Sequence, residues 1–447
     1  MKIYIDVLKI YSYISEKMHI NGLWGEKPIN FYGGEIMLLN GAWESKVDIY
    51  NVFELRCKTT AYFGIGAIKK FKDICEFLNK KDMKKILILT DEVVYNVTGI
   101  KEKVEKFLGE AGIEYIVYYG IKPNPNVKMI DEAKKMGLDF GAKAVIGIGG
   151  GSHIDTAKSV AVLLHEKYKN YTGSDLYELK FIPEEALPII AINTTHGTGT
   201  EVDRFAVATI EEKGYKPAIA YDSIYPIFAI DDPEITKSLP WSQTTYTAID
   251  AINHVTEAAT TLAASPYSIL LAKETIRLVS KYLPQAQAKP GDLTARYFLL
   301  YASTIAGISF DNGLLHFTHA LEHPLSGIRP DLPHGLGLAM LLPAVVKAIY
   351  SAQAEVLAEI YSPIVPGLKG VPGEAEEAAK GIEKWLFNIG VTQKLTDEGF
   401  KESDIDKLVE LAFNTPSLDL LLSLAPVKAT KEIVKQIYMD SLYPLNK

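Results

Sequence analysis

Five of the nine histidines of this 447-residue chain fall between residues 250 and 334. They are His254, His316, His319, His323 and His334, and Asp250 precedes the first of them by four positions. Residues four apart in a helix lie on one face, so Asp250 with His254, and His319 with His323, can each face one point. Imidazoles with one carboxylate suit iron or zinc better than magnesium or calcium. The window therefore indicates a metal site.

An ordinary structural reading of these histidines stays open at this stage. A single histidine on an amphipathic helix is more often a packed core or surface residue than a ligand. Two pairs at helical spacing and a Pro333-His334-Gly335 turn favour the metal site. Ligand spacing by itself, however, identifies a metal site and not its reaction.

A second motif follows the apolar run at residues 144–148, which leads directly into Gly149-Gly150-Gly151-Ser152 and a helical pattern. Glycine lets a phosphate approach the backbone, and the free N–H groups and dipole of a helix N-terminus attract an anion. The same residues also fit an ordinary turn, in which Ser152 and Asp155 form a capping box. The spacing is not that of the standard dinucleotide fingerprint, so a nucleotide that binds here must contact the glycines in a different arrangement.

Small hydroxyl residues and glycines follow a further apolar run in the motif TTHGTG, residues 194–199. Hydroxyl and amide groups beside a buried strand suit the wall of a polar ligand site. A simple glycine and threonine turn explains the composition equally well.

The organisation of the chain changes after the segment FAIDDPEITKSLP. Before it, apolar runs of strand length alternate with helical patterns, and after it only helical periodicity continues. The sequence therefore predicts an α/β domain over residues 1–236 and an all-α domain over residues 237–447. Residues 1–56 are expected to be an N-terminal extension that adds an edge or cap to the first domain.

Composition excludes several classes of function. The net charge of -8 argues against nucleic acid as a partner, because phosphate binding needs a basic face. Cys57 and Cys75 are the only cysteines, which fits a reducing compartment. No signal-peptide core and no long uninterrupted apolar run occurs. We expect a cytoplasmic, soluble protein with no membrane partner.

The motifs GGGS-x-x-D, TT-x-GTG, D-x3-H and H-x3-H-PL-x-G-x6-PHG occur in this order, and the chain resembles the iron-activated (group III) alcohol dehydrogenase family over residues 58–440. The resemblance implies a Rossmann-like N-terminal domain and an all-α C-terminal domain, the architecture shared with dehydroquinate synthases. It also implies that a nicotinamide dinucleotide and an alcohol bind between the two domains.

Carried over by position, the resemblance implies a set of site residues. The metal ligands would be Asp250, His254, His319 and His334, and His323 would be catalytic as a proton relay. The cofactor would be held by Gly150, Gly151 and Ser152 at the pyrophosphate, with Asp155 of the same motif, by Thr194, Thr195 and Asn124 along its length, and by Asp91 at the adenosine ribose. His196 and His316 depart from the family pattern and could line the pocket or simply pack.

Asp91 bears on the choice of cofactor. It ends the strand pattern KKILILT, and a carboxylate there can accept hydrogen bonds from a ribose 2′-OH while repelling a 2′-phosphate. Asp91 could instead only cap the helix that begins at Glu92, and both roles can coexist. We expect NAD to be favoured over NADP.

The resulting prediction is a metal-dependent oxidoreductase that transfers a hydride between a primary alcohol and NAD(P), with Fe2+ in the site, where Zn2+ would also fit. A small-molecule alcohol or aldehyde is the expected partner, in a homo-oligomer with a dimer favoured. The alternatives are a hydroxyacid–oxoacid transhydrogenase with a tightly held nicotinamide and, more remotely, a catalytically silent metal- or nucleotide-binding subunit.

Overall fold

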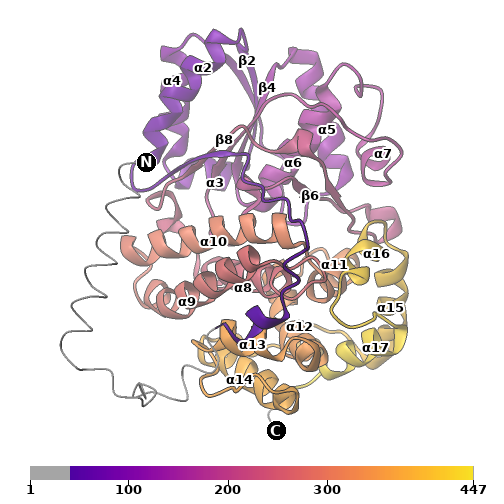
Figure 1. Cartoon of the computed structure of the whole chain (residues 1–447). Helices are drawn as coiled ribbons and strands as arrows, with labels where there is room; N and C mark the ends of the chain where they lie inside the picture. Colours follow the sequence, from indigo (N-terminus) through magenta and orange to yellow (C-terminus); the bar gives the residue numbers. More distant parts are fainter. Residues whose placement is uncertain (1–40, 446–447) are drawn as a thin grey trace, which may run out of the picture. The chain divides into compact units, whose positions relative to one another are not determined.

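The computed structural model describes residues 41–445 of the chain (Figure 1). Its centre is a parallel six-stranded sheet in the order β1-β8-β5-β4-β2-β3. The strands are β1 (Thr60–Phe63), β2 (Lys85–Leu89), β3 (Glu114–Tyr118), β4 (Ala144–Gly149), β5 (Ile189–Asn193) and β8 (Phe228–Asp231). The predicted Rossmann-like α/β half is confirmed.

The middle of this sheet is buried on both faces. Every residue of β4 (AVIGIG) and β5 (IIAIN) is buried, and Ile146 pairs with Ile190 in register. Successive side chains of a strand point to opposite faces, so Leu87 packs under one helical layer and Ile88 under the other. Strands covered on both faces need nearly continuous apolar runs, which explains the uninterrupted apolar sequences of β4 and β5.

Helices connect the strands and cover both faces. Buried residues of α5 and α6 pack on one face, and those of α2 and α4 pack on the other. The helices of this half are α2 (Phe71–Lys80), α3 (Glu92–Val97), α4 (Ile100–Glu110), α5 (Val127–Phe140), α6 (Gly151–Leu164) and α7 (Gly173–Tyr177). An antiparallel pair, β6 (Phe205–Val207) and β7 (Ala218–Ala220), stands apart from the sheet.

From Trp241 onward the described chain is helical. The helices are α8 (Trp241–Ala258), α9 (Pro266–Ala288), α10 (Leu293–Gly313), α11 (Phe317–Ile328), α12 (His334–Ile349), α13 (Ala354–Tyr361), α14 (Ala375–Asn388), α15 (Ile405–Asn414), α16 (Leu418–Ser423) and α17 (Lys431–Asp440). Helices α8, α9 and α10 pack against one another beside the sheet half (Figure 1). The predicted all-α second half is confirmed, while the division at residues 236 and 237, within the turn Ile235–Ser238, stays a prediction.

Short 3-10 turns complete the described secondary structure. They are η1 (Ala42–Lys46), η2 (Ala67–Lys70), η3 (Thr200–Val202), η4 (Glu211–Lys213), η5 (Asp222–Ile224), η6 (Ile235–Ser238), η7 (Tyr350–Ala352), η8 (Pro372–Glu374) and η9 (Glu402–Asp404). One segment of the described residues, His334–Ala352, is long and apolar enough to cross a membrane, and 78% of its most apolar window is buried within the protein. Helices α10 and α11 would meet the same criterion only as a pair bent by 106°.

The described part of the N-terminal extension contacts the helical half, although we expected the extension to add an edge or cap to the first domain. Trp43 Nε1 donates to Glu359 at 3.1 Å, and Lys46 pairs with Glu355 on α13 at 2.9 Å. Further along, the backbone of Arg56 exchanges two hydrogen bonds with the side chain of Asn312 at 2.6 and 3.0 Å. Polar contacts between segments far apart in sequence decide this placement, and periodicity cannot reveal them. Residues 1–40 of the extension, which include the segment without a signal-peptide core, lie outside the described residues.

Candidate metal centre and dinucleotide site

One predicted helical pair, Asp250 with His254, and one member of the other pair, His319, meet at a single carboxylate oxygen. Asp250 and His254 lie one turn apart on α8, and His319 lies on α11. Oδ1 of Asp250 is 3.5 Å from Nε2 of His254 and 3.5 Å from Nε2 of His319. The rings of His254 and His319 stack with centroids 4.5 Å apart. Two helices therefore present their ligand atoms to the same point.

The third helix, α12, brings His334 to this point. Asp250, His319 and His334 each offer a ligand atom, and these atoms lie within 4.8 Å of one another. Oδ1 of Asp250 and Nε2 of His319 are buried and have no hydrogen-bond partner among the described residues. Buried polar atoms are normally paired, so a divalent cation fits the donor set. His254 lies beside this group through its contact with Asp250.

Two glutamates that the sequence analysis missed hold the imidazoles in place. Glu257 accepts a hydrogen bond from Nδ1 of His319, and Glu322 accepts one from Nδ1 of His334. Histidines that bind metals commonly use their second nitrogen in this way, which fixes the tautomer and the ring orientation. A faint signal existed in the sequence, since Glu257 and Glu322 each follow a predicted ligand by three positions.

The ionisation states suit a cation. Burial acts to raise the pKa of Asp250, but the imidazoles of His254, His319 and His334 outweigh burial and lower it to about 2. Burial lowers the pKa of His254 to about 4. Burial also opposes the charge on His319, yet Glu257 and Asp250 raise its pKa to about 9. A metal ion at this point would take the place of the proton on His319.

Lys216 carries a positive charge from the sheet half into this site, and the sequence analysis did not single it out. Its ammonium lies 2.8 Å from Oγ of Ser326 and 3.5 Å from both Glu322 Oε2 and His334 Nδ1. It also donates to Oδ1 of Asn124 at 3.0 Å. Only the β6–β7 turn that carries Lys216 brings it near α11, so no local pattern marks it.

Asn124, predicted to line the cofactor, ties the two halves together. It has a positive φ of 51°, and its amide donates to the carbonyl oxygens of Pro330 and Leu332 at 2.9 and 3.1 Å. Those carbonyls belong to the loop that leads into His334. Any contact of Asn124 with a cofactor therefore remains a prediction, while its link to the metal-binding loop is present.

His323 projects from α11 near His334, with ring centroids 5.9 Å apart. Burial and the charge of Lys216 lower the pKa of His323 well below its ordinary value, so the imidazole is neutral. Its Nδ1 is buried and has no hydrogen-bond partner among the described residues. This is the state that a proton acceptor needs, and it is consistent with the predicted relay.

In the sheet half, the glycine loop after β4 packs against the loop after β5. A Cβ atom on Gly150 would lie 2.7 Å from Cγ2 of Thr195, and one on Gly151 would lie 2.8 Å from Cγ2 of Thr198. These approaches are too close for any side chain. Thr194 is buried, and its N–H donates to the carbonyl of Gly149 at 3.1 Å. The motifs GGGS and TTHGTG thus form one surface at the carboxyl ends of β4 and β5.

The alternative reading of this motif, a capping box formed by Ser152 and Asp155, is not what the structure shows. Gly150 is the N-cap residue, and no side chain caps the helix. Ser152 lies inside the first turn, and the carboxylate of Asp155 accepts hydrogen bonds from Thr200 Oγ1 at 2.7 Å and from the N–H of Val207 at 3.0 Å. Asp155 therefore anchors the segment that follows TTHGTG. The uncapped first turn of α6 stays available for an anion.

Asp91 lies at the carboxyl end of β2, beside the glycine loop. Its Oδ1 accepts the N–H of Val94 at 2.9 Å, so it caps α3 as one of the two readings predicted. Its Oδ2 lies 2.8 Å from Nε2 of His153. Burial acts to raise the pKa of Asp91, but these hydrogen bonds outweigh burial and lower it. The carboxylate is half-buried and ionised.

His196 and His316 both pack instead of lining a pocket. Nε2 of His196 lies 2.9 Å from Nη1 of the buried Arg296, and burial and this cation lower its pKa to about 3. Nδ1 of His316 accepts the N–H of Phe317, and Nε2 lies 2.9 Å from Oγ1 of Thr260. Complete burial with satisfied ring nitrogens assigns both to structure.

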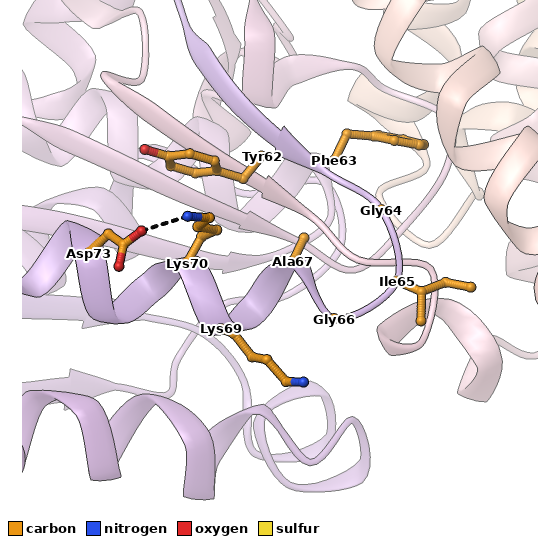
Figure 2. A pocket seen from close by; sticks show the side chains of 9 residues that line it. All are labelled: Tyr62, Phe63, Gly64, Ile65, Gly66, Ala67, Lys69, Lys70 and Asp73. Carbon is orange, nitrogen blue, oxygen red and sulfur yellow. Dashed lines mark hydrogen bonds and ion pairs between the residues drawn. The ribbon is translucent and has the colours of Figure 1, made fainter.

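A hollow of about 430 Å³ lies elsewhere, at the turn after β1. Figure 2 shows Tyr62, Gly66 and Lys70 among the residues around it, with Lys70 paired to Asp73 at 2.8 Å. None of the residues that line it is a predicted ligand or cofactor residue. The site assembled above is therefore distinct from this surface hollow.

Comparison with known proteins agrees with this geometry. The family described as iron-containing alcohol dehydrogenase matches residues 58–233, and its C-terminal counterpart, the Fe-containing alcohol dehydrogenase family, matches residues 244–442. The chain is 62% identical over 399 residues to a long-chain primary alcohol dehydrogenase of Thermoanaerobacter ethanolicus, which covers 89% of this chain and 100% of the relative.

Solved structures show the same similarity. An NADH-dependent butanol dehydrogenase from Thermotoga maritima superposes with a TM-score of 0.77 at 31% identity, covering 88% of this chain and 99% of that one. An archaeal halo-thermophilic alcohol dehydrogenase from a Red Sea brine pool gives a TM-score of 0.79 at 27% identity, covering 88% and 100%. The chain belongs to the iron-containing alcohol dehydrogenase family and is an oxidoreductase of that family.

Proposed function

We propose that this chain interconverts primary alcohols and aldehydes, long-chain ones among them, with Fe2+ bound by Asp250, His254, His319 and His334 and with NAD as the hydride carrier. The observation that carries the proposal is that ligand atoms from three helices lie within 4.8 Å of one another, two of them buried and without a hydrogen-bond partner among the described residues. The 62% identical relative named for long-chain primary alcohols supports the substrate class.

The metal, when bound, supplies Lewis acidity that lowers the pKa of an alcohol. The residues of the chain do the rest. Glu257 and Glu322 hold the imidazoles of His319 and His334 in their ligand tautomer. The neutral imidazole of His323 is the proposed acceptor of the proton that the alcohol loses, because its buried Nδ1 has no hydrogen-bond partner among the described residues and can accept.

The dinucleotide is proposed to lie along the carboxyl ends of β2, β4 and β5. The uncapped N-terminus of α6, with Gly150, Gly151 and Ser152, would receive the pyrophosphate, and Thr194 and Thr195 would flank it. Asp91 would accept a hydrogen bond from the 2′-OH of the adenosine ribose, and its negative charge would repel a 2′-phosphate. Asn124 and Asp155 are proposed to act by positioning the loops around the cofactor. Cytoplasmic location, a homo-oligomer and a division near residue 236 complete the proposal.

Metal analysis of protein purified without air, paired with a rate survey, tests this function. We expect stoichiometric iron and NAD-dependent oxidation of straight-chain primary alcohols, with longer chains among the better substrates. Metal-loaded protein that oxidises no alcohol with NAD or NADP would overturn the proposal. Turnover without added NAD, given an alcohol donor and an oxo-acid acceptor, would show a transhydrogenase instead.

A further inference from the structure

His153 connects the two halves of the proposed dinucleotide site. It is the third residue of α6, yet its ring folds back across the end of β4 and reaches Asp91 at the end of β2. Nε2 of His153 lies 2.8 Å from Oδ2 of Asp91. A residue of the pyrophosphate-facing helix thus touches the residue proposed to face the ribose.

Gly149 makes this contact sterically feasible. A Cβ atom on Gly149 would lie 2.2 Å from Cγ and Nδ1 of the His153 ring, so no side chain fits there. Its φ of 150° also lies in the region that side chains rarely adopt. The first glycine of the motif therefore provides room for an imidazole, whereas Gly150 and Gly151 provide room for threonines.

The direction of the hydrogen bond follows from the partners. Asp91 is ionised at neutral pH because its pKa is lowered, although burial acts to raise it, so its oxygens can only accept. Nε2 of His153 must therefore carry the proton and donate. With Val94 N–H bound to Oδ1, both oxygens of Asp91 are held by donors from different elements. The carboxylate is fixed in one rotamer.

We infer that His153 is a specificity-determining residue for the dinucleotide, which acts by holding the Asp91 carboxylate against the ribose. The inference rests on the proposed role of Asp91. A fixed carboxylate directs its remaining lone pairs at a 2′-OH, and it cannot swing away to relieve repulsion from a 2′-phosphate. Without His153 the carboxylate rotates, so NAD binding weakens and NADP binding improves.

Calorimetric dissociation constants for NAD and NADP, measured on the metal-loaded enzyme, test the inference. The matched variants are His153→Gln, which keeps a donor, and His153→Met, which has nearly the same length and no donor. We expect His153→Met to lower the ratio of the NADP to the NAD dissociation constant about tenfold, the loss of one hydrogen bond to a charged group. His153→Gln should stay within about threefold of the wild type.

The Asp91→Ala background separates this inference from the proposed function. If His153 acts through Asp91, His153→Met added to Asp91→Ala leaves the ratio unchanged. An unchanged ratio in His153→Met, with a collapsed ratio in Asp91→Ala, would overturn the role of His153 and leave the proposed function standing. An unchanged ratio in Asp91→Ala would instead remove the proposed role of Asp91, and this inference with it. If His153→Met does not fold, His153→Ala, which also lacks a donor, takes its place, and an unchanged ratio in that variant overturns the inference.

Discussion

The proposed metal centre and the proposed dinucleotide edge of this protein are built from different kinds of groups. The metal centre consists of side chains from α8, α11 and α12, and Glu257 and Glu322 hold two of its imidazoles from neighbouring helices. The dinucleotide edge consists of backbone and small residues at the ends of three parallel strands, where Gly150 and Gly151 matter for what they lack. The proposed metal centre thus depends on ligand atoms of specific side chains, whereas the proposed dinucleotide edge depends on positions where a side chain is absent.

Loss of one proposed metal ligand should have the largest effect on activity and should affect the metal centre without changing the dinucleotide edge. We expect His334→Ala or His254→Ala to abolish both metal retention and turnover, because one of four ligands is removed. Mass spectrometry of bound metal and initial rates check this, with NAD affinity measured as the control. A variant with full metal content and a near wild-type rate contradicts the ligand assignment.

His323→Ala should slow the reaction while keeping the metal. A positioned acid–base group contributes about 100-fold to 10,000-fold to the rate, so we expect a loss in this range near neutral pH. The pH profile of kcat, together with the metal content, checks this. Loss of metal in this variant would place His323 among the ligands instead.

Replacing Glu322 by glutamine should have a smaller effect on the same centre. The amide keeps the size of the side chain but is uncharged and holds the Nδ1–H of His334 less strongly, so metal affinity should fall about 10-fold to 100-fold. Competition with a chelator measures this. Glu410→Gln, at an exposed ion pair on α15, is the matched control and should change nothing.

A change at Asp91 should affect only the proposed dinucleotide edge. We expect Asp91→Gly to narrow or reverse the preference for NAD, because a hydrogen bond worth about 1 to 3 kcal/mol and a like-charge contact both disappear. Ratios of kcat/KM with NAD and NADP check this, and the metal content should not change. A wild-type enzyme that already prefers NADP contradicts the assignment.

His196 ties the sheet half to α8 and α10 through Thr247 and Arg296, and the effect of replacing it should be the smallest. The unfolded imidazole takes up a proton near pH 6.5, whereas the buried one resists until about pH 3, because burial and Arg296 disfavour its charge. Its contribution to stability is therefore present above pH 6.5 and is lost as the pH falls, by up to about 1.4 kcal/mol per pH unit. The Tm of the wild type should fall more steeply than that of His196→Gln between pH 6.5 and 5. Parallel curves would contradict this role.

Local spacing was enough to predict a metal site in this window, while the resemblance supplied the set of proposed ligands. Asp250 with His254, and His319 with His323, are each one helical turn apart, so helix geometry places each pair on one face. The approach of His319 to Asp250 depends on the packing of α11 against α8. The glycine motif could also be recognised from the sequence, because the strand, the glycines and the start of the helix follow one another directly along the chain. The alternative reading, a capping box, does not occur, because Thr200 and Val207 donate hydrogen bonds to the Asp155 carboxylate instead.

The sequence by itself therefore determined the two folding classes, the order of the motifs and the residues that share a helix face. Tertiary structure alone decided which carboxylate supports which imidazole, since Glu257 and His319 are 62 positions apart and meet only when α8 packs beside α11. It also decided that Lys216 reaches Glu322 and that His196 binds Arg296. Side-chain spacing within an element is fixed by backbone geometry, whereas contacts between elements depend on how their faces pack.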